Sequence, residues 1–287
     1  MITEASLTPL QEIRRGINTT RPVFLQLPLL NQPRVSVVIP ALNEAENLPY
    51  VLPRIPNWVD EVLLVDGHST DDTIEVARRL RPNIRIVQQE GCGKGAALRT
   101  GCRLATGDIL VLLDADGSTD PGEIPVFVGA LLAGADYVKG SRFLQGARTT
   151  DMPRYRMLGN GLLVVLANLL FSTHYTDITY GYNAVWRHHV ESLALDIDGW
   201  PYEIISNIRA ARIGLRVVEA ASVEYDRIAG QAKLEAFSAG WSILHAILCE
   251  RFKKVAPCQQ RVEAFRHYEA SGHCGVKART LTDDCEP

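Results

Sequence analysis

The sequence predicts an α/β fold in which a mostly parallel sheet is flanked by helices and followed by a C-terminal helical extension. Two observations lead to this prediction. Short apolar runs alternate with helical segments, which is the pattern of strand–helix–strand units in a parallel sheet. In addition, the run at residues 109–113 (Ile-Leu-Val-Leu-Leu) is apolar at every position, as expected for a strand buried on both faces.

The first half of the chain contains four such strands with helices between them. Each strand is a short run rich in Val, Ile or Leu that ends at proline or at polar residues: 35–39, 61–65, 84–87 and 109–113. The intervening helices begin at Asn, Thr or glycine-rich positions: 43–52, 73–80 and 93–104. Right-handed crossovers between parallel strands place helices on both faces of the sheet.

The second half departs from this strict alternation. We expect helices at 125–133, 154–171, 202–213 and 234–254, and strands at 136–140, 184–186 and 215–220. In the last helix Leu234, Phe237, Trp241 and Leu244 are spaced by three or four residues, which predicts an amphipathic face.

Composition narrows the classes of protein to consider. Of the 287 residues, 46% are hydrophobic and 22% charged, so a substantial core is expected. The net charge of -3 lacks the basic excess of a nucleic-acid-binding protein, so no nucleic-acid partner is expected. No Cys-x-x-Cys pair occurs, which favours a reduced, cytoplasmic setting. The C-terminal His and Cys residues match no standard zinc spacing: Cys258, His267, His273, Cys274 and Cys285.

The chain is expected to form one domain with two extensions. Residues 1–33 are proline-containing and irregular, residues 34–250 form the domain, and residues 251–287 form a tail. We expect no signal peptide and no integral membrane segment, because the longest apolar stretch, 162–171, is far shorter than the roughly 20 residues a spanning helix needs. Residues 162–171 and 234–254 are alternatively candidates for lying on a bilayer. For 162–171 we favour ordinary core packing.

Two carboxylates follow the strand at 109–113. Asp114 and Asp116 stand at its carboxyl end, where open α/β sheets bind their ligands. Together they suit a hard divalent cation, which in turn suits a diphosphate. Taken alone, an Asp-x-Asp pair is better explained as turn residues after a strand. Motifs at the other strand ends favour the metal site.

These motifs occur in a recognisable order and spacing: Val-Ile-Pro-Ala-Leu-Asn-Glu (38–44), Val-Asp-Gly-His-Ser-Thr-Asp-Asp-Thr (65–73), Gly-Lys-Gly-Ala-Ala (93–97), Asp-Ala-Asp (114–116) and Gly-Ser-Arg-Phe (140–143). They resemble those of the family 2 glycosyltransferases with the GT-A fold, which is Rossmann-like. The sequence most resembles the dolichol-phosphate (polyprenol-phosphate) mannosyltransferase branch. Residues 227–233 match its Arg-x-x-Gly-x-Ser-Lys element at Arg, Gly and Lys, and residues 177–182 match its Asp-x-x-x-Gly-Tyr/Phe element. The resemblance covers roughly residues 34–250.

The resemblance implies a nucleoside pocket lined by residues of the first two strand ends: Pro40, Leu42, Glu44 and Asp66. A carboxylate there can accept hydrogen bonds from ribose hydroxyls or a base N–H. The alternatives are that Glu44 caps the first helix and that Asp66 only begins a turn.

For the diphosphate, the resemblance implies Mg²⁺ or Mn²⁺ on Asp114 and Asp116, with Ala115 between them in the same donor site. Lys94 follows as a cation for phosphate. The remaining cationic candidates for the donor diphosphate or an acceptor phosphate are Arg142, Arg227 and Lys233. Their alternative is a solvated surface charge.

Glu203 is the one candidate for a general base. An acceptor hydroxyl needs a base, whereas a phosphate acceptor is already anionic and needs cationic binding groups instead. Glu203 is equally readily explained as an acid at a helix N-terminus, which the helix dipole favours.

Three departures from the branch bear on specificity. The second-strand motif reads Val-Asp-Gly-His-Ser rather than Val-Asp-Asp-Gly-Ser, and Leu42 replaces a common aromatic residue, so the nucleotide and the sugar stay open. Ala232 replaces the Ser before Lys233 and removes a hydroxyl donor for a phosphate acceptor.

The resemblance implies an inverting, metal-dependent glycosyltransferase that moves a hexose from a GDP- or UDP-sugar, with mannose from GDP-mannose as first choice, to a polyprenyl phosphate. The alternatives are a soluble natural-product or small-metabolite acceptor and, in a different class, a nucleotidyltransferase or nucleotide-sugar-binding protein. Peripheral contact with the cytoplasmic membrane face and a homo-oligomer are further expectations left open.

Overall fold

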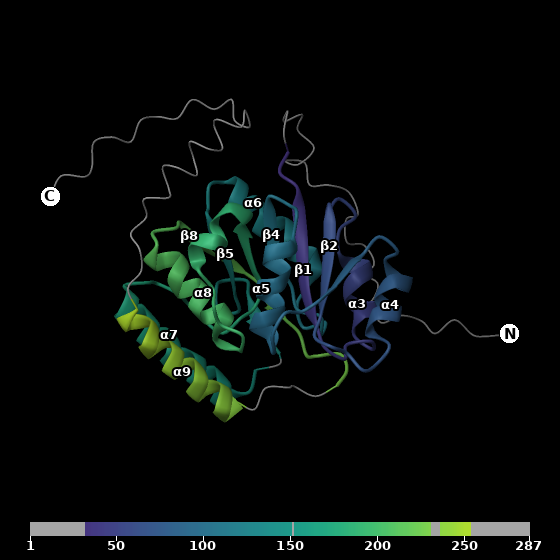
Figure 1. The fold of residues 1–287 in the computed structure, drawn as a ribbon. Coiled ribbons are helices and arrows are strands. Elements are labelled where there is room, and N and C mark those ends of the chain that lie inside the picture. Colours follow the sequence, from purple (N-terminus) through teal and green to yellow (C-terminus); the bar gives the residue numbers. More distant parts are fainter. Residues whose placement is uncertain (1–31, 151, 231–235, 254–287) are drawn as a thin grey trace. The chain divides into compact units, whose positions relative to one another are not determined.

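The computed structural model describes residues 32–150, 152–230 and 236–253, and the fold of these residues is the expected α/β class (Figure 1). Their large sheet has the strand order β3-β2-β1-β4-β7-β5-β8. All pairs are parallel except those that β7 makes with β4 and β5. The strands are β1 (Val35–Ala41), β2 (Glu61–Asp66), β3 (Arg85–Gln88), β4 (Ile109–Leu112), β5 (Tyr137–Ser141), β7 (Asn183–Trp186) and β8 (Val217–Ala221).

The winding of the chain creates a crevice beside β1. Strand β1 pairs with β2 on one edge and with β4 on the other, with Ala41 opposite Asp66 and Val38 opposite Leu112. The chain therefore winds from β1 out to β3 and then crosses to the other side of β1. Open α/β sheets bind ligands at such a switch point, beyond the carboxyl ends of the strands.

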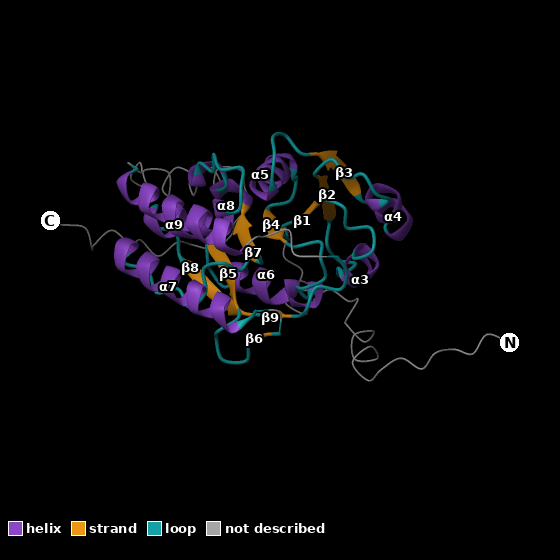
Figure 2. Ribbon diagram, turned by 90° about the horizontal axis from the view of Figure 1, so that it is seen from below, coloured by secondary structure: helices purple, strands orange, loops and turns teal. Residues whose placement is uncertain are grey.

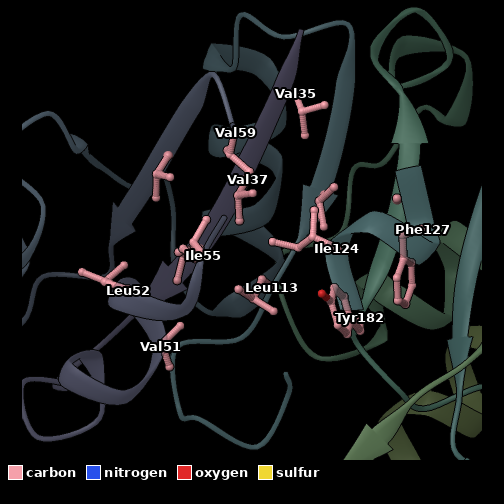
Figure 3. Close-up of a cluster of buried hydrophobic side chains, with 14 of the residues drawn as sticks. Val35, Val37, Val51, Leu52, Ile55, Val59, Leu113, Ile124, Phe127 and Tyr182 are labelled. Atoms are coloured by element: carbon pink, nitrogen blue, oxygen red, sulfur yellow. The ribbon is translucent and has the colours of Figure 1, made fainter. Parts of the chain in front are cut away.

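Helices cover both faces of this sheet. The helices are α3 (Leu48–Val51), α4 (Thr73–Leu80), α5 (Lys94–Leu104), α6 (Ile124–Leu132), α7 (Arg154–Phe171), α8 (Pro201–Arg212) and α9 (Ala236–Phe252). On one face, Val37 of β1 joins a core that includes Ile124 and Phe127 of α6 (Figure 3). On the other, Val38 joins residues of α5 and α8. This alternation along β1 follows from the two-residue repeat of a strand.

A third core lies between α7, α8 and α9. Val164 and Ala167 of α7 pack with Ile204 and Ile208 of α8 and with Ile247 of α9. Both ribbon views show α7 and α9 running side by side (Figures 1 and 2). This core holds α7 and α9 against α8 and against β8 of the large sheet.

The expected helix at 43–52 is wrong in its first half. Asn43 has φ of 53°, which a helix does not allow, and the chain then turns through a hydrogen bond from Asn47 N to Glu44 O of 2.9 Å. The helix begins only at α3, where Pro49 occupies the first turn. A short two-stranded sheet, β6 (Arg148–Thr149) with β9 (Val223–Glu224), was not expected from the sequence pattern.

Helix α7 confirms the expected core packing of residues 162–171 on one side of the helix only. Its inner face is buried, but Leu162, Val165 and Leu169 are 65%, 57% and 78% exposed. A helix whose residues are nearly all apolar shows no polar side in its sequence, so the sequence did not indicate which side would face solvent.

The expected extensions lie mostly outside the described residues. This holds for residues 1–31 and for the C-terminal His and Cys residues considered for zinc. Helix α9 ends at Phe252 and so crosses the boundary expected at residue 250. The domain limits themselves stay predictions.

Gly101 of α5 generates the first testable prediction. A Cβ at this position would lie 2.3 Å from Val38 Cγ1 and 2.9 Å from Val65 Cγ2, so only glycine lets α5 approach the sheet this closely. Gly101→Ala is expected to lower the free energy of unfolding by about 1–3 kcal/mol through overpacking. Urea unfolding would measure this change. The matched control is Gly161→Ala in α7, where an added Cβ meets nothing within 4 Å and is expected to stabilise by up to about 1 kcal/mol.

Candidate active site

A pocket of about 470 Å³ lies at the carboxyl end of β4. Asp114 and Asp116 line it from the loop after this strand, and helices α7, α8 and α9 contribute the remaining walls. Six of the residues expected to act in catalysis or phosphate binding line this pocket: Lys94, Asp114, Asp116, Arg142, Glu203 and Arg227. The structure therefore brings these residues together. Lys233 lies outside the described residues.

Lys94 joins two carboxylates from separate parts of the chain. It is the first residue of α5, and its Nζ lies 2.6 Å from Asp114 Oδ1 and 2.8 Å from Glu203 Oε1. Glu203 is in the first turn of α8 and its side chain is only 7% exposed. The indole of Trp200 is on the same side, with its centroid 5.8 Å from Nζ. Lys94 thus neutralises two acids that line the pocket.

The pKa values in this cluster follow from burial and charge. Burial raises the pKa of Asp114 to about 6, because the attraction of Lys94 is partly offset by repulsion from Glu203 and Asp116. Burial acts against the charged form of Lys94 as well, but Asp114 and Glu203 outweigh it and hold the pKa of the ammonium above its usual value. Lys94 therefore remains a cation in the resting site.

Asp116 has a different cation. Its Oδ2 accepts a hydrogen bond from Arg227 Nη2 at 2.9 Å, and Arg227 Nη1 lies 3.3 Å from each carboxylate oxygen of Glu44. The Oδ1 atom of Asp116 accepts from the amide (3.0 Å) and the hydroxyl (2.7 Å) of Ser118. Arg227 therefore connects the carboxyl end of β4 with the turn that follows β1.

Arg142 is fully engaged within the protein. Its Nε and Nη2 bind the two oxygens of Asp177 at 2.7 and 3.0 Å, Nη1 binds Glu224, and Nη2 also donates to Thr179. All five guanidinium donors thus have acceptors, and the guanidinium also lies 4.9 Å from the ring of Tyr180. Burial acts against its charge, but Asp177 and Glu224 raise the pKa of Arg142 above its usual value. Arg142 would have to exchange a carboxylate to bind phosphate.

The residues expected in the nucleoside pocket form a separate group beside β1 and β2. Asp66 is fully buried, and its carboxylate accepts from the amides of His68 and Ser69 and from the Gln88 side chain. This is the turn-forming role considered as its alternative. Leu42 is 40% exposed at the mouth of the crevice, whereas Pro40 is partly buried within β1. Their contact with a nucleoside stays a prediction.

Several contacts in the site were not foreseen from the sequence. Asn47 binds Glu44 at 2.6 Å and exchanges two hydrogen bonds with the backbone of Ala229. A Cβ on Gly181 would lie 2.3 Å from Glu203 Oε1, so glycine at this position makes room for the Lys94–Glu203 pair. The sequence gives no sign of the role of Asn47, whereas Gly181 lies within the Asp-x-x-x-Gly-Tyr/Phe element at 177–182.

The donor set fits a divalent cation that shares its coordination with a substrate. Asp114 and Asp116 line the pocket and offer hard carboxylate oxygens. Among the described residues there is no cluster of three or more His, Cys, Asp or Glu side chains suited to a metal. Mg²⁺ typically takes one or two carboxylates and completes its shell with water and substrate phosphates. The two aspartates match that pattern.

Removing Lys94 should destabilise the fold strongly. Lys94→Met leaves two neighbouring carboxylates without their cation, and we expect a loss of about 3 kcal/mol in the free energy of unfolding at pH 7.5. The double variant Lys94→Met/Glu203→Gln should recover part of this loss. Arg103→Met is the control on the same helix, because its exposed pair with Glu90 is worth less than about 1 kcal/mol. Equal losses for Lys94 and Arg103 variants would contradict the prediction.

The raised pKa of Asp114 predicts a pH dependence of cation binding. A protonated carboxyl is a poor ligand, so affinity for Mn²⁺ should fall as the pH drops through about 6, whereas an ordinary aspartate would stay ionised to about 4. Titrations of Mn²⁺ followed by electron paramagnetic resonance between pH 5 and 8 would measure this. Constant affinity from pH 7.5 to 5 would show that Asp114 is not a ligand or that its pKa is not raised.

The sequence of this chain matches one protein family and is similar to several named proteins. The description of the matching family is "Glycosyl transferase family 2", and the match covers residues 36–191, more than half of the chain. An undecaprenyl-phosphate mannosyltransferase of Micrococcus luteus is 31% identical over 224 residues, which is 74% of this chain and 92% of that protein. A polyprenol monophosphomannose synthase of Mycolicibacterium smegmatis is 32% identical and aligns over 70% of this chain and 81% of its own length.

A solved structure agrees with the fold. Glucosyl-3-phosphoglycerate synthase from Mycobacterium tuberculosis, crystallised with Mn²⁺, UDP-glucose and phosphoglyceric acid, superposes with a TM-score of 0.59 at 26% identity, covering 76% of this chain and 80% of that one. The GT-A fold expected from the motifs is therefore confirmed, as is the resemblance to polyprenol-phosphate mannosyltransferases. Given this fold and these sequence matches, the chain belongs to glycosyl transferase family 2 and is a nucleotide-sugar-dependent glycosyltransferase.

Proposed function

We propose that this enzyme transfers a hexose, with mannose from GDP-mannose as first choice, to a polyprenyl phosphate at a membrane surface, with inversion at the sugar. Mg²⁺ or Mn²⁺ on Asp114 and Asp116 would bind the donor diphosphate. The relatives from Micrococcus and Mycolicibacterium support the acceptor, since their names state mannosyl transfer to polyprenyl phosphates.

The observation that carries this proposal is an exposed apolar face that is continuous with the pocket. On α7 the exposed residues Tyr155, Leu158, Leu162, Val165 and Leu169 follow a spacing of three or four, and α9 adds Trp241, Leu248 and Phe252. We call these residues the apolar face. Tyr155 and Trp241 also line the pocket. The apolar chain of such an acceptor would lie on the apolar face, and its phosphate head would enter the adjoining pocket.

Basic residues border this face at the helix ends. Arg154 at the start of α7 and Arg251 at the end of α9 are exposed, and the Lys253 side chain is 48% exposed. Such residues suit the anionic headgroups of a bilayer. No helix within the described residues has the length and apolar character needed to cross a membrane. The arrangement supports binding in the plane of the interface through α7 and α9.

The surroundings of Glu203 favour phosphate over a hydroxyl as the acceptor. A general base must be able to take a proton from the acceptor, but Glu203 is buried and held at 2.8 Å by the Lys94 ammonium. The carboxylate oxygen that would have to face an acceptor hydroxyl is therefore already in contact with the ammonium. An acceptor phosphate needs no base, because it is already an anion at neutral pH.

The proposed reaction is a single displacement. An acceptor phosphate oxygen attacks C1 of the sugar, the bond between C1 and the donor phosphate oxygen breaks, and the electron pair leaves with the nucleoside diphosphate. A divalent cation, when bound, supplies positive charge for that leaving group. Lys94 keeps the repulsion between Asp114 and Glu203 small, and Arg227 is within reach of a phosphate placed at Asp116.

A soluble phosphorylated acceptor is the second candidate. It is favoured by the solved neighbour from Mycobacterium tuberculosis, which was crystallised with phosphoglyceric acid and UDP-glucose. The apolar face has no role in that alternative. The two candidates therefore differ in their dependence on a membrane.

Product analysis tests the reaction. With GDP-mannose, Mn²⁺ and vesicles that contain undecaprenyl phosphate, we expect a lipid-linked mannose and an equal amount of GDP, both lost in Asp116→Ala. Transfer only to water-soluble acceptors would favour the second candidate. Absence of a lipid-linked product with every common GDP- and UDP-hexose would refute the proposal.

A second experiment isolates the apolar face. Leu162→Gln/Leu169→Gln should lower transfer to vesicle-bound undecaprenyl phosphate by roughly 10-fold or more, because it places two polar groups in the surface that meets the bilayer. Transfer to a short-chain, water-soluble polyprenyl phosphate should change less than about 2-fold. Val126→Gln is the matched control, since Val126 is exposed on α6 outside the apolar face. Equal losses with both acceptors would argue against a membrane role.

A further inference from the structure

A short segment runs from the loop after β4 to the turn after β1. We call residues 225–230 the strap. At one end the Tyr225 amide donates to Ser118 O at 2.8 Å. At the other, the Ala229 amide donates to Asn47 Oδ1 at 2.9 Å, and Asn47 Nδ2 donates back to Ala229 O at 3.2 Å. The strap is therefore tied on both sides of the switch point.

The middle of the strap is fixed by charge and by packing. Arg227 binds Asp116 on one side and Glu44 on the other, and its side chain is only 20% exposed. Beside it, Ile228 lies against Gly117, where an added Cβ would come within 2.5 Å of Ile228 Cδ1. The guanidinium thus lies against an oxygen of Asp116 that the proposed cation site would use.

Both aspartates of the Asp-Ala-Asp motif are consequently neutralised from within the chain. Lys94 holds Asp114 and Arg227 holds Asp116. The two contacts differ in what supports them. Each cation has a second, buried carboxylate partner: Glu203 lies 2.8 Å from Lys94, whereas Glu44 lies 3.3 Å from Arg227. Lys94 is the first residue of helix α5, whereas Arg227 belongs to the strap, which forms neither helix nor strand. Arg227 is the cation that a local movement can withdraw.

We propose that Arg227 is a latch that competes with the divalent cation for Asp116, so that cation binding releases the strap. Release frees the guanidinium from Asp116 and makes its donors available to the diphosphate that arrives with the cation. The inference rests on the proposed metal site. It does not depend on which sugar or acceptor the enzyme uses.

The latch predicts an effect opposite to that of an ordinary phosphate-binding arginine. Removing the Arg227 guanidinium should tighten the binding of the cation in the absence of nucleotide. The reason is that Asp116 is then no longer occupied by the guanidinium in any of the molecules. In the absence of nucleotide, the Arg227→Gln variant should bind Mn²⁺ about 5- to 30-fold more tightly than the wild type. This range is expected if Arg227 is released from Asp116 in roughly 3–20% of wild-type molecules. The whole chain is titrated with MnCl₂ at constant ionic strength, and free Mn²⁺ is followed by electron paramagnetic resonance.

Two further variants separate the latch from simple electrostatics. Arg156→Gln removes the same charge from another residue lining the pocket and should change the affinity less than about 2-fold. Asn47→Ala changes no charge but releases the far end of the strap, so it should also tighten Mn²⁺ binding. In wild-type protein, hydrogen exchange of the Ala229 amide should accelerate when Mn²⁺ is added.

The outcomes are distinct. Tighter binding in Arg227→Gln and Asn47→Ala, with faster exchange at Ala229, supports the latch. Wild-type affinity in both variants, or an increase no larger than in Arg156→Gln, overturns it while leaving the proposed metal site and transfer reaction intact. If no variant binds Mn²⁺ but transfer proceeds, the latch and the metal site both fail, whereas the acceptor proposal survives.

Discussion

The active site depends on the ion cluster of Lys94, Asp114 and Glu203, because it joins the start of α5, the end of β4 and the start of α8 at one point. Such a cluster is stable only if each charge keeps its partner, since an uncompensated buried charge costs several kcal/mol. The neighbouring backbone fits closely around it. Gly95 lies against the carbonyl of Ile197, where a Cβ would come within 2.6 Å, and Gly181 leaves room for the Glu203 carboxylate.

Arg142 and Arg227 both line the site but are bound in different ways. This difference indicates which of the two charges mainly stabilises the fold and which can act on a ligand. Arg142 is 5% exposed and has all five donors satisfied by Asp177, Glu224 and Thr179, so it mainly fixes the second half of the domain. Arg227 lines the same pocket, and its contacts with Glu44 are longer, at 3.3 Å. The Arg227–Asp116 side chains are 20% and 18% exposed, against 4% and 0% for Arg142–Asp177, and exchange of partners is less costly for a partly exposed ion pair than for a fully buried one.

The sequence was sufficient to predict features that one local rule determines. It was insufficient for contacts between residues that are distant in the chain. Strands buried on both faces must be apolar throughout, so the run at 109–113 and the position of Asp114 and Asp116 after it were predictable. The partners of Arg142 were not, because Asp177 and Glu224 are far away in the chain and only tertiary structure brings them together. Turn chemistry explains the error at 43–52, where the positive φ of Asn43 delays the helix.

The apolar wall of the pocket is connected to its charged wall through one polar residue of α7. Asn160 is buried on the inner side of this mostly apolar helix, and its Oδ1 accepts from the Thr179 hydroxyl at 2.9 Å. Thr179 in turn accepts from Arg142, and its neighbour Gly181 borders Glu203. A polar residue inside an apolar interface is stable only when paired, so this hydrogen bond fixes the register of α7 against the 177–182 element. The distance from the apolar face to Asp114 and Asp116 is therefore set by the fold, which is what an acceptor with a phosphate head and an apolar chain would require.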